Sequence, residues 1–322
     1  MKTIQLLNQQ QLSQPVAIAL ARHRVLRESH PCLPRRSASD FAARLGWMLE
    51  HGRVLALCES EDVLAYWASF RIDNFRNLGP GEYCPDWANG ARVDLDVTTR
   101  IRCYRLLYRE MAARAVSQGT PVHAISVYAY DEAVMEALSL SGFGRIVTDR
   151  VQTMADLQNM LSAATRQESA ATIRLASGND SAALCQFNGQ LAQHLGASPV
   201  FLPAPRAWGA QEWHDWLHED GNVALVAVQQ GEICGYIKAE GSQFDVSYSL
   251  EDPANLSISG LFVAPELRGQ QIARQLLAAL VDYGLQQGRS FMAVDCETTN
   301  LEALGFWSRF FEPVNWSYER RI

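Results

Sequence analysis

The segment from Leu256 to Gln287 constrains the fold of this 322-residue chain more than any other part. It begins with an apolar run that ends before Pro265, and it continues through a short polar turn that contains Gly269. Apolar residues then recur every three or four positions, which predicts one buried face of a helix. These residues are Ile272, Leu276, Leu277, Leu280 and Val281. The sequence therefore predicts a strand, a tight loop and a helix.

The turn between this strand and this helix has the chemistry of an anion-binding site. A helix N-terminus presents unpaired backbone N–H groups and a partial positive charge. Gly269 lacks a Cβ and lets a ligand approach the backbone, while Arg268 and Arg274 can donate charge-assisted hydrogen bonds to phosphate. The predicted ligand group is a phosphate or pyrophosphate. The alternative is an ordinary strand-to-helix connection that contains a glycine and an arginine.

Length and composition limit the class of protein. A chain of this length accommodates two domains of about 150 residues each. Its formal net charge of −7 argues against a general nucleic-acid binder. The seven cysteines are scattered without a C-x-x-C pair, which argues against a disulfide framework and a zinc site. We therefore expect no metal. Because no apolar run reaches about 18 residues and no signal peptide is evident, we expect a cytoplasmic protein without a membrane span.

The first half of the chain alternates between helical and strand patterns. Residues 1–36 are polar and predict at most one short helix, and residues 74–90 read as a long loop. The expected helices cover 37–50, 98–118 and 132–140, and the expected strands cover 53–59, 63–70, 122–128 and 146–154. Residues 158–171 are rich in Ser, Ala and Gln and are the expected linker, with a helical first part as the alternative.

The second half has a similar order of elements. Expected strands cover 172–176, 223–229, 232–240, 258–263, 291–296 and 314–320, the last of which closes the domain. Expected helices cover 180–195, 208–219 and 300–311 besides the one that starts at Ile272, and residues 244–250 form a strand or a loop. Because a helix, a Gln-Gly pair, a strand and a helix recur in both halves, we interpret them as two copies of one fold.

The segment LFVAPELRGQQIARQLL, from Leu261 to Leu277, resembles the acetyl-coenzyme A signature of the GNAT superfamily of N-acetyltransferases. That signature is Gln/Arg-x-x-Gly-x-Gly/Ala after an apolar strand. Arg268 and Ala273 match it, whereas Gln271 stands where the family usually has Gly. The resemblance covers about 150 residues of the second half well and is loose in the first half.

The resemblance implies a mixed α/β fold with two tandem GNAT-like domains, each a mostly antiparallel twisted central sheet flanked by helices. Residues 1–157 would form a degenerate copy without a phosphate loop, 158–171 the linker, and 172–322 the acetyl-CoA-binding domain. Where a phosphate loop would lie, the first copy has Asp94 and Asp96, whose carboxylates repel a pyrophosphate. We therefore expect no coenzyme A in the first domain.

The resemblance also implies which residues bind acetyl-CoA as a co-substrate. The backbone of one strand would pair with the pantetheine arm, the loop would hold the pyrophosphate, and an asparagine before the last helix would contact the coenzyme. These residues are Leu261, Phe262, Val263, Arg268, Gly269, Gln270, Gln271, Ile272, Ala273, Arg274 and Asn300. The alternative role of Asn300 is a plain helix N-cap.

The catalytic groups are less evident. Many members have a tyrosine acid in the last helix, and Trp307 stands at that position. An indole N–H is a very poor proton source, so either the thiolate leaves unassisted or another group such as Tyr318 serves. Glu240 and Tyr248 are candidates for the general base by location alone.

An acceptor pocket is expected where two helices follow the first strand of the second half. Aromatic and imidazole side chains there either line that pocket or belong to the core and the solvated surface. They are Trp208, Trp213, His214, Trp216 and His218.

The expected function is that of an acyl-CoA-dependent N-acetyltransferase, which moves an acetyl group from acetyl-CoA to an amine of a small molecule or peptide. The chain would act as a monomer or homodimer. The alternative is a non-catalytic acyl-CoA-binding regulatory protein, which would bind the coenzyme without turnover. A different phosphate-binding fold has little support, because the Gly-Lys-Ser/Thr and full Gly-x-Gly-x-x-Gly patterns are absent.

Overall fold

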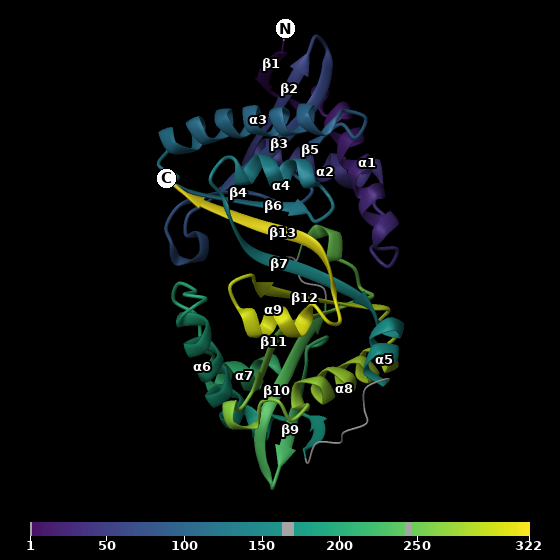
Figure 1. The fold of residues 1–322 in the computed structure, drawn as a ribbon, viewed down its shortest axis with the longest axis vertical. Helices are drawn as coiled ribbons and strands as arrows, with labels where there is room; N and C mark the ends of the chain where they lie inside the picture. The colour runs from purple at the N-terminus through teal and green to yellow at the C-terminus, as the bar shows by residue number, and fades with distance from the viewer. Residues whose placement is uncertain (1, 163–170, 242–246) are drawn as a thin grey trace. The chain divides into compact units, whose positions relative to one another are not determined.

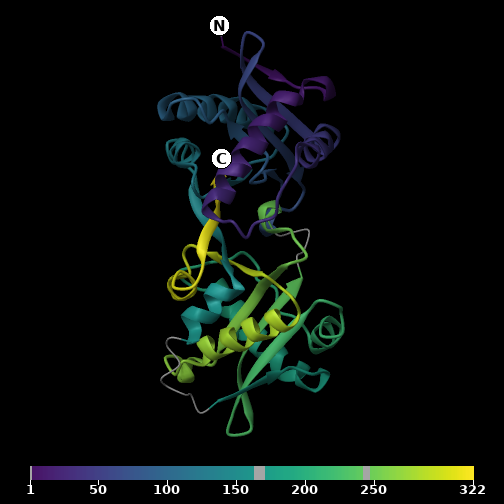
Figure 2. The same cartoon turned by 90° about the vertical axis from the view of Figure 1, so that its right-hand side faces the viewer.

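A computed structural model describes residues 2–162, 171–241 and 247–322. The chain divides into two compact units. The first comprises Met1–Thr148, Ser247–Ser249 and Pro313–Ile322, and the second comprises Asp149–Val246 and Leu250–Glu312. Figures 1 and 2 show their helices and strands from two directions. The predicted fold class, mixed α/β with mostly antiparallel sheets, is confirmed.

The first unit contains a sheet with strand order β1-β2-β3-β4-β6-β13, and β5 pairs with β3. All these pairs are antiparallel except β4 with β6, which is parallel. The strands are β1 (Lys2–Leu6), β2 (Gly52–Glu59), β3 (Asp62–Ile72), β4 (Gly81–Cys84), β5 (Asn89–Ala91), β6 (Val122–Tyr128) and β13 (Glu312–Arg321). The helices are α1 (Ser13–Ser29), α2 (Ala38–His51), α3 (Val97–Ser117) and α4 (Glu132–Ser139).

Helix α2 illustrates how local sequence sets an element in this unit. Ser37 caps the helix, because its side chain accepts a hydrogen bond from the Asp40 N–H while Asp40 reaches back to the Ser37 N–H. The helix then buries Phe41, Leu45 and Met48, which share one face at intervals of three and four residues. The prediction of a helix over 37–50 is confirmed.

Two predictions for the first half are wrong. Residues 1–36 hold the strand β1 and the 17-residue helix α1 rather than one short helix. Helix α1 buries Arg22 and His23 on its inner face, which interrupts the apolar stripe that would reveal it. The predicted loop over 74–90 contains β4 and the start of β5, whose hydrogen bonds come from β3 and β6 rather than from a local pattern.

The second unit contains a sheet with strand order β12-β11-β10-β9-β8. The β11–β12 pair is parallel and the other pairs are antiparallel. The strands are β8 (Thr172–Leu175), β9 (Val223–Gln229), β10 (Glu232–Gly241), β11 (Asn255–Val263) and β12 (Phe291–Glu297). The helices are α5 (Met154–Ser162), α6 (Ser181–Gly196), α7 (Ala210–Trp216), α8 (Ile272–Gln286) and α9 (Leu301–Trp307). Strand β7 (Gly144–Thr153) contains the division between the two units.

Two helical layers cover opposite faces of the second sheet. Successive residues of a strand point to opposite faces. Accordingly, Leu225 of β9 packs in the cluster of α5, α8 and α9, while Val226 packs in the cluster of α6 and α7. Each layer has a helix close to β11, α6 on one face and α8 on the other. Together with α9, these helices surround the end of that strand.

The sequence position of strand β13 suggests that it closes the second unit, but the structure shows that it does not. Asn315 to Arg321 pair antiparallel with Tyr128 to Val122 of β6 in the first unit. Local sequence predicts that this segment is a strand but contains no information on which strand it pairs with. Of the expected linker, residues up to Ser162 belong to α5, so the helical alternative is correct there, and residues 163–170 lie outside the described residues. The segment 244–250 is described only from Ser247, where Tyr248–Leu250 form a short 3-10 helix.

Candidate active site

A cavity of about 750 Å³ lies in the second unit between β11, β12, α6, α8 and α9. Most of the residues that the sequence singles out for coenzyme binding line it, as does Trp307. They are Leu261, Phe262, Val263, Arg268, Gly269, Gln271, Ile272, Ala273, Arg274 and Asn300. Gln270 and Glu240 do not line it.

The cavity opens because the two parallel strands separate. Their pairing ends at Ile258 and Val294, although β11 continues to Val263 and β12 to Glu297. At the same point β11 has a bulge: Gly260 and Ile258 pair with consecutive residues of β10, so Ser259 is an extra residue. Beyond the bulge, the described residues provide no strand partner for the β12-facing edge of β11, and its backbone groups can bind an extended ligand there.

The loop before α8 has a backbone suited to an anion. Gly269 has φ of +82°, and a Cβ at this residue would meet no atom within 4 Å, so the space beside it is open. Gln271 also adopts the left-handed conformation, with φ of 65° and ψ of 4°. Glycine favours this conformation, which is a physical reason for glycine at this position in the signature. Gln271 is the N-cap and its side chain makes no capping hydrogen bond, so the first-turn N–H groups are left for a ligand.

The two arginines of the loop already have protein partners. Arg268 donates from Nη1 to Glu302 Oε2 of α9 at 2.9 Å, in a pair exposed to solvent. Arg274 donates from Nη2 to the Met160 carbonyl of α5 at 2.8 Å, while its buried Nε has no hydrogen-bond partner. A phosphate would thus compete with a solvent-screened ion pair at Arg268, which is a weak competitor.

Asn300 and His194 meet across the cavity. Asn300 caps α9, because its Oδ1 accepts from the Ala303 N–H at 3.2 Å. The same Oδ1 lies 3.5 Å from His194 Nε2, which comes from the last turn of α6. The sequence interpretation missed His194. A signal was available, since His194 follows Leu191 by three residues and therefore lies on the same face of the helix as Leu191 and Leu195.

Glu240 lies on β10 and its carboxylate faces a lysine. Its Oε1 is 3.4 Å from Lys238 Nζ, and both side chains are buried. Lys238 Nζ also lies 3.9 Å from the ring centroid of Trp208, and burial lowers the pKa of this lysine. Gly260 accommodates this lysine, because a Cβ at the bulge would lie 3.3 Å from Lys238 Cγ.

Two of the three tryptophans expected near the acceptor, Trp213 and Trp216, are core residues, and Trp208 is half-buried against them. Trp213 and Trp216 are buried and their ring centroids lie 5.6 Å apart, edge to face. His214 and His218 are exposed neighbours on the outside of this cluster, with ring centroids 4.5 Å apart. The core alternative is therefore the one that the structure supports.

The two candidate tyrosines belong to the first unit. Tyr318 lies on β13, where its OH accepts from Arg145 Nη2 at 2.9 Å. Tyr248 packs edge to face on Phe41, with ring centroids 6.0 Å apart. In the second unit, Trp307 is buried against Phe311.

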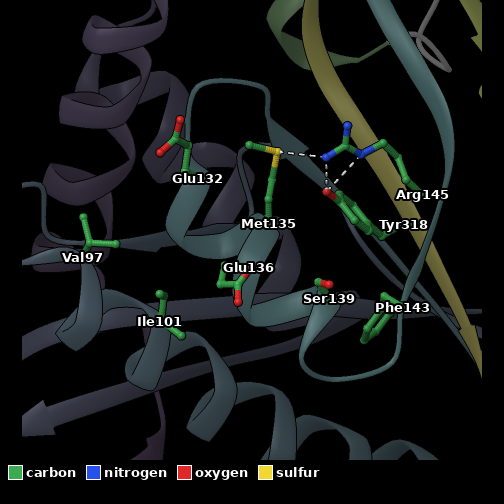
Figure 3. A pocket seen from close by; sticks show the side chains of 9 residues that line it. All are labelled: Val97, Ile101, Glu132, Met135, Glu136, Ser139, Phe143, Arg145 and Tyr318. Carbon is green, nitrogen blue, oxygen red and sulfur yellow. Dashed lines mark hydrogen bonds between the residues drawn. The ribbon is translucent and has the colours of Figure 1, made fainter.

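Among the described residues of the first unit, the start of α3 has a carboxylate cap where α8 of the second unit has none. Asp96 caps α3 by accepting from the Thr99 N–H at 2.9 Å, so a carboxylate stands at this helix N-terminus. A cavity of about 640 Å³ lies between α3 and α4, and Figure 3 shows Glu132 and Glu136 on its wall. Arg145 also lines this cavity, and its guanidinium donates a hydrogen bond to the Tyr318 hydroxyl (Figure 3). Negative charge at both places is unfavourable for a pyrophosphate.

Two further features bear on the class of protein. In residues 2–162, 171–241 and 247–322, no helix is both long and apolar enough to cross a membrane. The same residues contain no group of three or more His, Cys, Asp or Glu side chains that could hold a metal ion.

The separated parallel strands, the bulge and the uncapped helix N-terminus together border one open cavity in the second unit. Residues 193–311 match the model of the Acetyltransferase (GNAT) family, so the chain carries a domain of this family.

Solved structures similar to the whole chain share its fold. One is a tandem GNAT protein from the clavulanic acid biosynthesis pathway, at 12% identity and TM-score 0.52, over 100% of this chain and 98% of that one. Another is a GCN5-related N-acetyltransferase from Sphaerobacter thermophilus, at 12% identity and TM-score 0.55, over 99% and 95%. No curated protein has a significant sequence match to the chain.

Proposed function

We propose that the protein is an N-acetyltransferase that transfers an acetyl group from acetyl-CoA to the amine of a small molecule or peptide. The single observation that carries the proposal is the opening between β11 and β12, which leads from the bulge at Ser259 to the uncapped N-terminus of α8. An extended pantetheine arm fits the free strand edge, and a pyrophosphate fits the helix end.

Each group around the opening has a role in this proposal. The backbone of Leu261, Phe262 and Val263 holds the arm and polarises the thioester carbonyl, since N–H groups aimed at a developing oxyanion stabilise the transition state. The loop from Arg268 to Arg274 holds the pyrophosphate. Trp307 forms part of the wall.

We further propose that the chain is a tandem pair of GNAT-like domains in which only the second binds coenzyme A. Two observations support the tandem arrangement of domains: each unit contains one parallel strand pair, and the chain shares its fold with the tandem GNAT protein. Asp96 at the N-terminus of α3 and the acidic cavity wall support the restriction to the second unit.

Isothermal titration of acetyl-CoA into the intact protein tests the proposal. We expect saturable binding at one site per chain, and binding at least tenfold weaker in the double variant Arg268→Glu, Gly269→Asp. Arg105→Glu repeats the Arg-to-Glu part of this charge change on an exposed residue of α3 and should leave affinity unchanged. Absence of binding to the intact protein would overturn the proposal. Binding without acetylation of any amine in a broad screen would instead favour a non-catalytic regulatory protein.

A further inference from the structure

We propose that His194 is the residue that moves the proton during acetyl transfer, accepting it at Nδ1 from the attacking amine and giving it to the departing sulfur. This inference rests on the proposed function and specifies the chemistry of the same site.

The position of His194 satisfies the first requirement, access to the cleft. Its side chain projects from the last turn of α6 into the cavity, beside Leu191 and Leu195. Across the cavity it meets Asn300, at the N-terminus of α9 and directly after β12. The imidazole thus lies in the wall that faces the separated ends of β11 and β12.

The hydrogen bond to Asn300 selects the tautomer of the ring. Asn300 Oδ1 accepts from the Ala303 N–H, which fixes the oxygen rather than the amide nitrogen as the atom near His194. An oxygen cannot donate, so His194 Nε2 must carry the proton. The contact of 3.5 Å is long, as catalytic hydrogen bonds often are before the substrate binds. In the neutral ring Nδ1 is then unprotonated and is free to accept a proton.

The other groups around the cavity are poor candidates for this task. The charged side chains on its walls are carboxylates and guanidiniums: Asp295, Glu297, Glu302, Arg268, Arg274 and Arg309. A guanidinium holds its proton too firmly to act as a base, and a carboxylate is a poor proton donor to sulfur, whereas one neutral imidazole can both accept and donate a proton. Burial raises the pKa of the Cys296 thiol to about 12. The indole of Trp307 is a donor with no useful acidity. An imidazole is therefore the lining group whose chemistry suits proton transfer near neutral pH.

The proposed step is balanced for atoms and electrons. The neutral amine attacks the thioester carbonyl carbon, and a C–N bond forms while the nitrogen loses one proton to His194 Nδ1. The C–S bond then breaks, and its electron pair goes to sulfur. The imidazolium returns the proton to sulfur, so coenzyme A leaves as a thiol and His194 is neutral again.

Nitrogen-15 NMR of the full-length protein tests this proposal without knowledge of the acceptor. The His194 ring signals are assigned as those missing from the spectrum of His194→Gln. We expect the Nε2–H tautomer in the neutral ring, and a change in the nitrogen-15 chemical shifts of the ring when acetyl-CoA is added. The Nδ1–H tautomer, or ring signals that acetyl-CoA leaves unmoved, would overturn the role of His194.

Calorimetric titration with acetyl-CoA, run beside the NMR experiment, separates this proposal from the proposed function. If calorimetry shows no binding of acetyl-CoA to the intact protein, the proposed function fails. If calorimetry shows binding but the tautomer is wrong, only the role of His194 fails. His218→Gln is the matched control, because this exposed imidazole lies outside the cavity. It should leave both the His194 signals and acetyl-CoA affinity unchanged, and His194→Gln should retain affinity within about twofold.

Discussion

Helix α6, which carries His194, is anchored to strand β8 by a buried carboxylate. Asp180 accepts two parallel hydrogen bonds from Arg174, each 2.8 Å long, and a third of 2.8 Å from the Ser177 N–H. The substitution Asp180→Asn keeps the shape of the side chain but removes its charge. We expect this variant to be less stable than the native protein at pH 7 and to lose part of the native sensitivity to acid.

The size of this effect follows from the pKa of Asp180. The Arg174 guanidinium, together with the Ser177 N–H, lowers the pKa of Asp180 from its ordinary 3.8 to about 2. At 1.36 kcal/mol per pH unit, this corresponds to about 2 kcal/mol. The Arg174 side chain is 45% exposed, so solvent screening reduces the expected contribution to about 1–1.5 kcal/mol. Because the ionised form is the stabilised one, this contribution is complete above about pH 4 and disappears as the pH falls through about 2.

Urea denaturation followed by circular dichroism measures this contribution between pH 7 and pH 2.5. We expect the native protein to exceed Asp180→Asn by about 1–1.5 kcal/mol at pH 7, and the gap to close below pH 4. Asp73→Asn is the control, since Asp73 is 94% exposed in its pair with Arg71 and should change stability by less than about 0.5 kcal/mol. A gap for Asp180→Asn that is as large at pH 3 as at pH 7 would refute the electrostatic reasoning.

Three further predictions concern residues of the second unit. A residue other than glycine costs about 1 kcal/mol in the left-handed conformation of Gln271, and glycine loses a similar amount in backbone entropy on folding. Gln271→Gly should therefore hardly change the thermal midpoint, while the β-branched Gln271→Val should lower it. A Val variant as stable as the native protein would contradict the left-handed conformation. Burial lowers the pKa of Lys238, so the unfolded chain binds more protons and the free energy of unfolding rises with pH up to about 10.5. Lys238→Met should flatten this rise in denaturation curves between pH 7 and pH 10, and an unchanged slope would exclude Lys238 as its source. Asn300→Ala should cost about 1 kcal/mol through loss of the α9 cap, and Asn300→Ser should cost much less; equal losses in thermal unfolding would argue against the cap.

Short-range patterns predicted most elements correctly. The stripe from Ile272 to Val281 predicted helix α8, because helical periodicity depends on residues close in sequence. Helix α1 was missed where the fold buries an ion pair: Arg22 Nη2 lies 3.1 Å from Asp131 Oδ2, and a pattern of apolar residues contains no sign of such a partner.

The candidate site was predictable in part for the same reason. One contiguous motif singled out Leu261 to Val263 and Arg268 to Arg274, and all of these residues except Gln270 line the cavity. Their backbone geometry was not readable from the motif: Gln271 takes a left-handed conformation that its side chain does not favour.

The sequence by itself determined the strand, loop and helix from Leu256 to Gln287, since these depend on interactions between near neighbours in the chain. Tertiary structure alone decided that β13 pairs with β6, that β11 separates from β12 after Ile258, and that His194 meets Asn300. Each of these depends on partners far apart in sequence, His194 and Asn300 being separated by 106 residues. Strand pairing and side-chain contacts over such distances are set by the packing of whole layers, which no local pattern encodes.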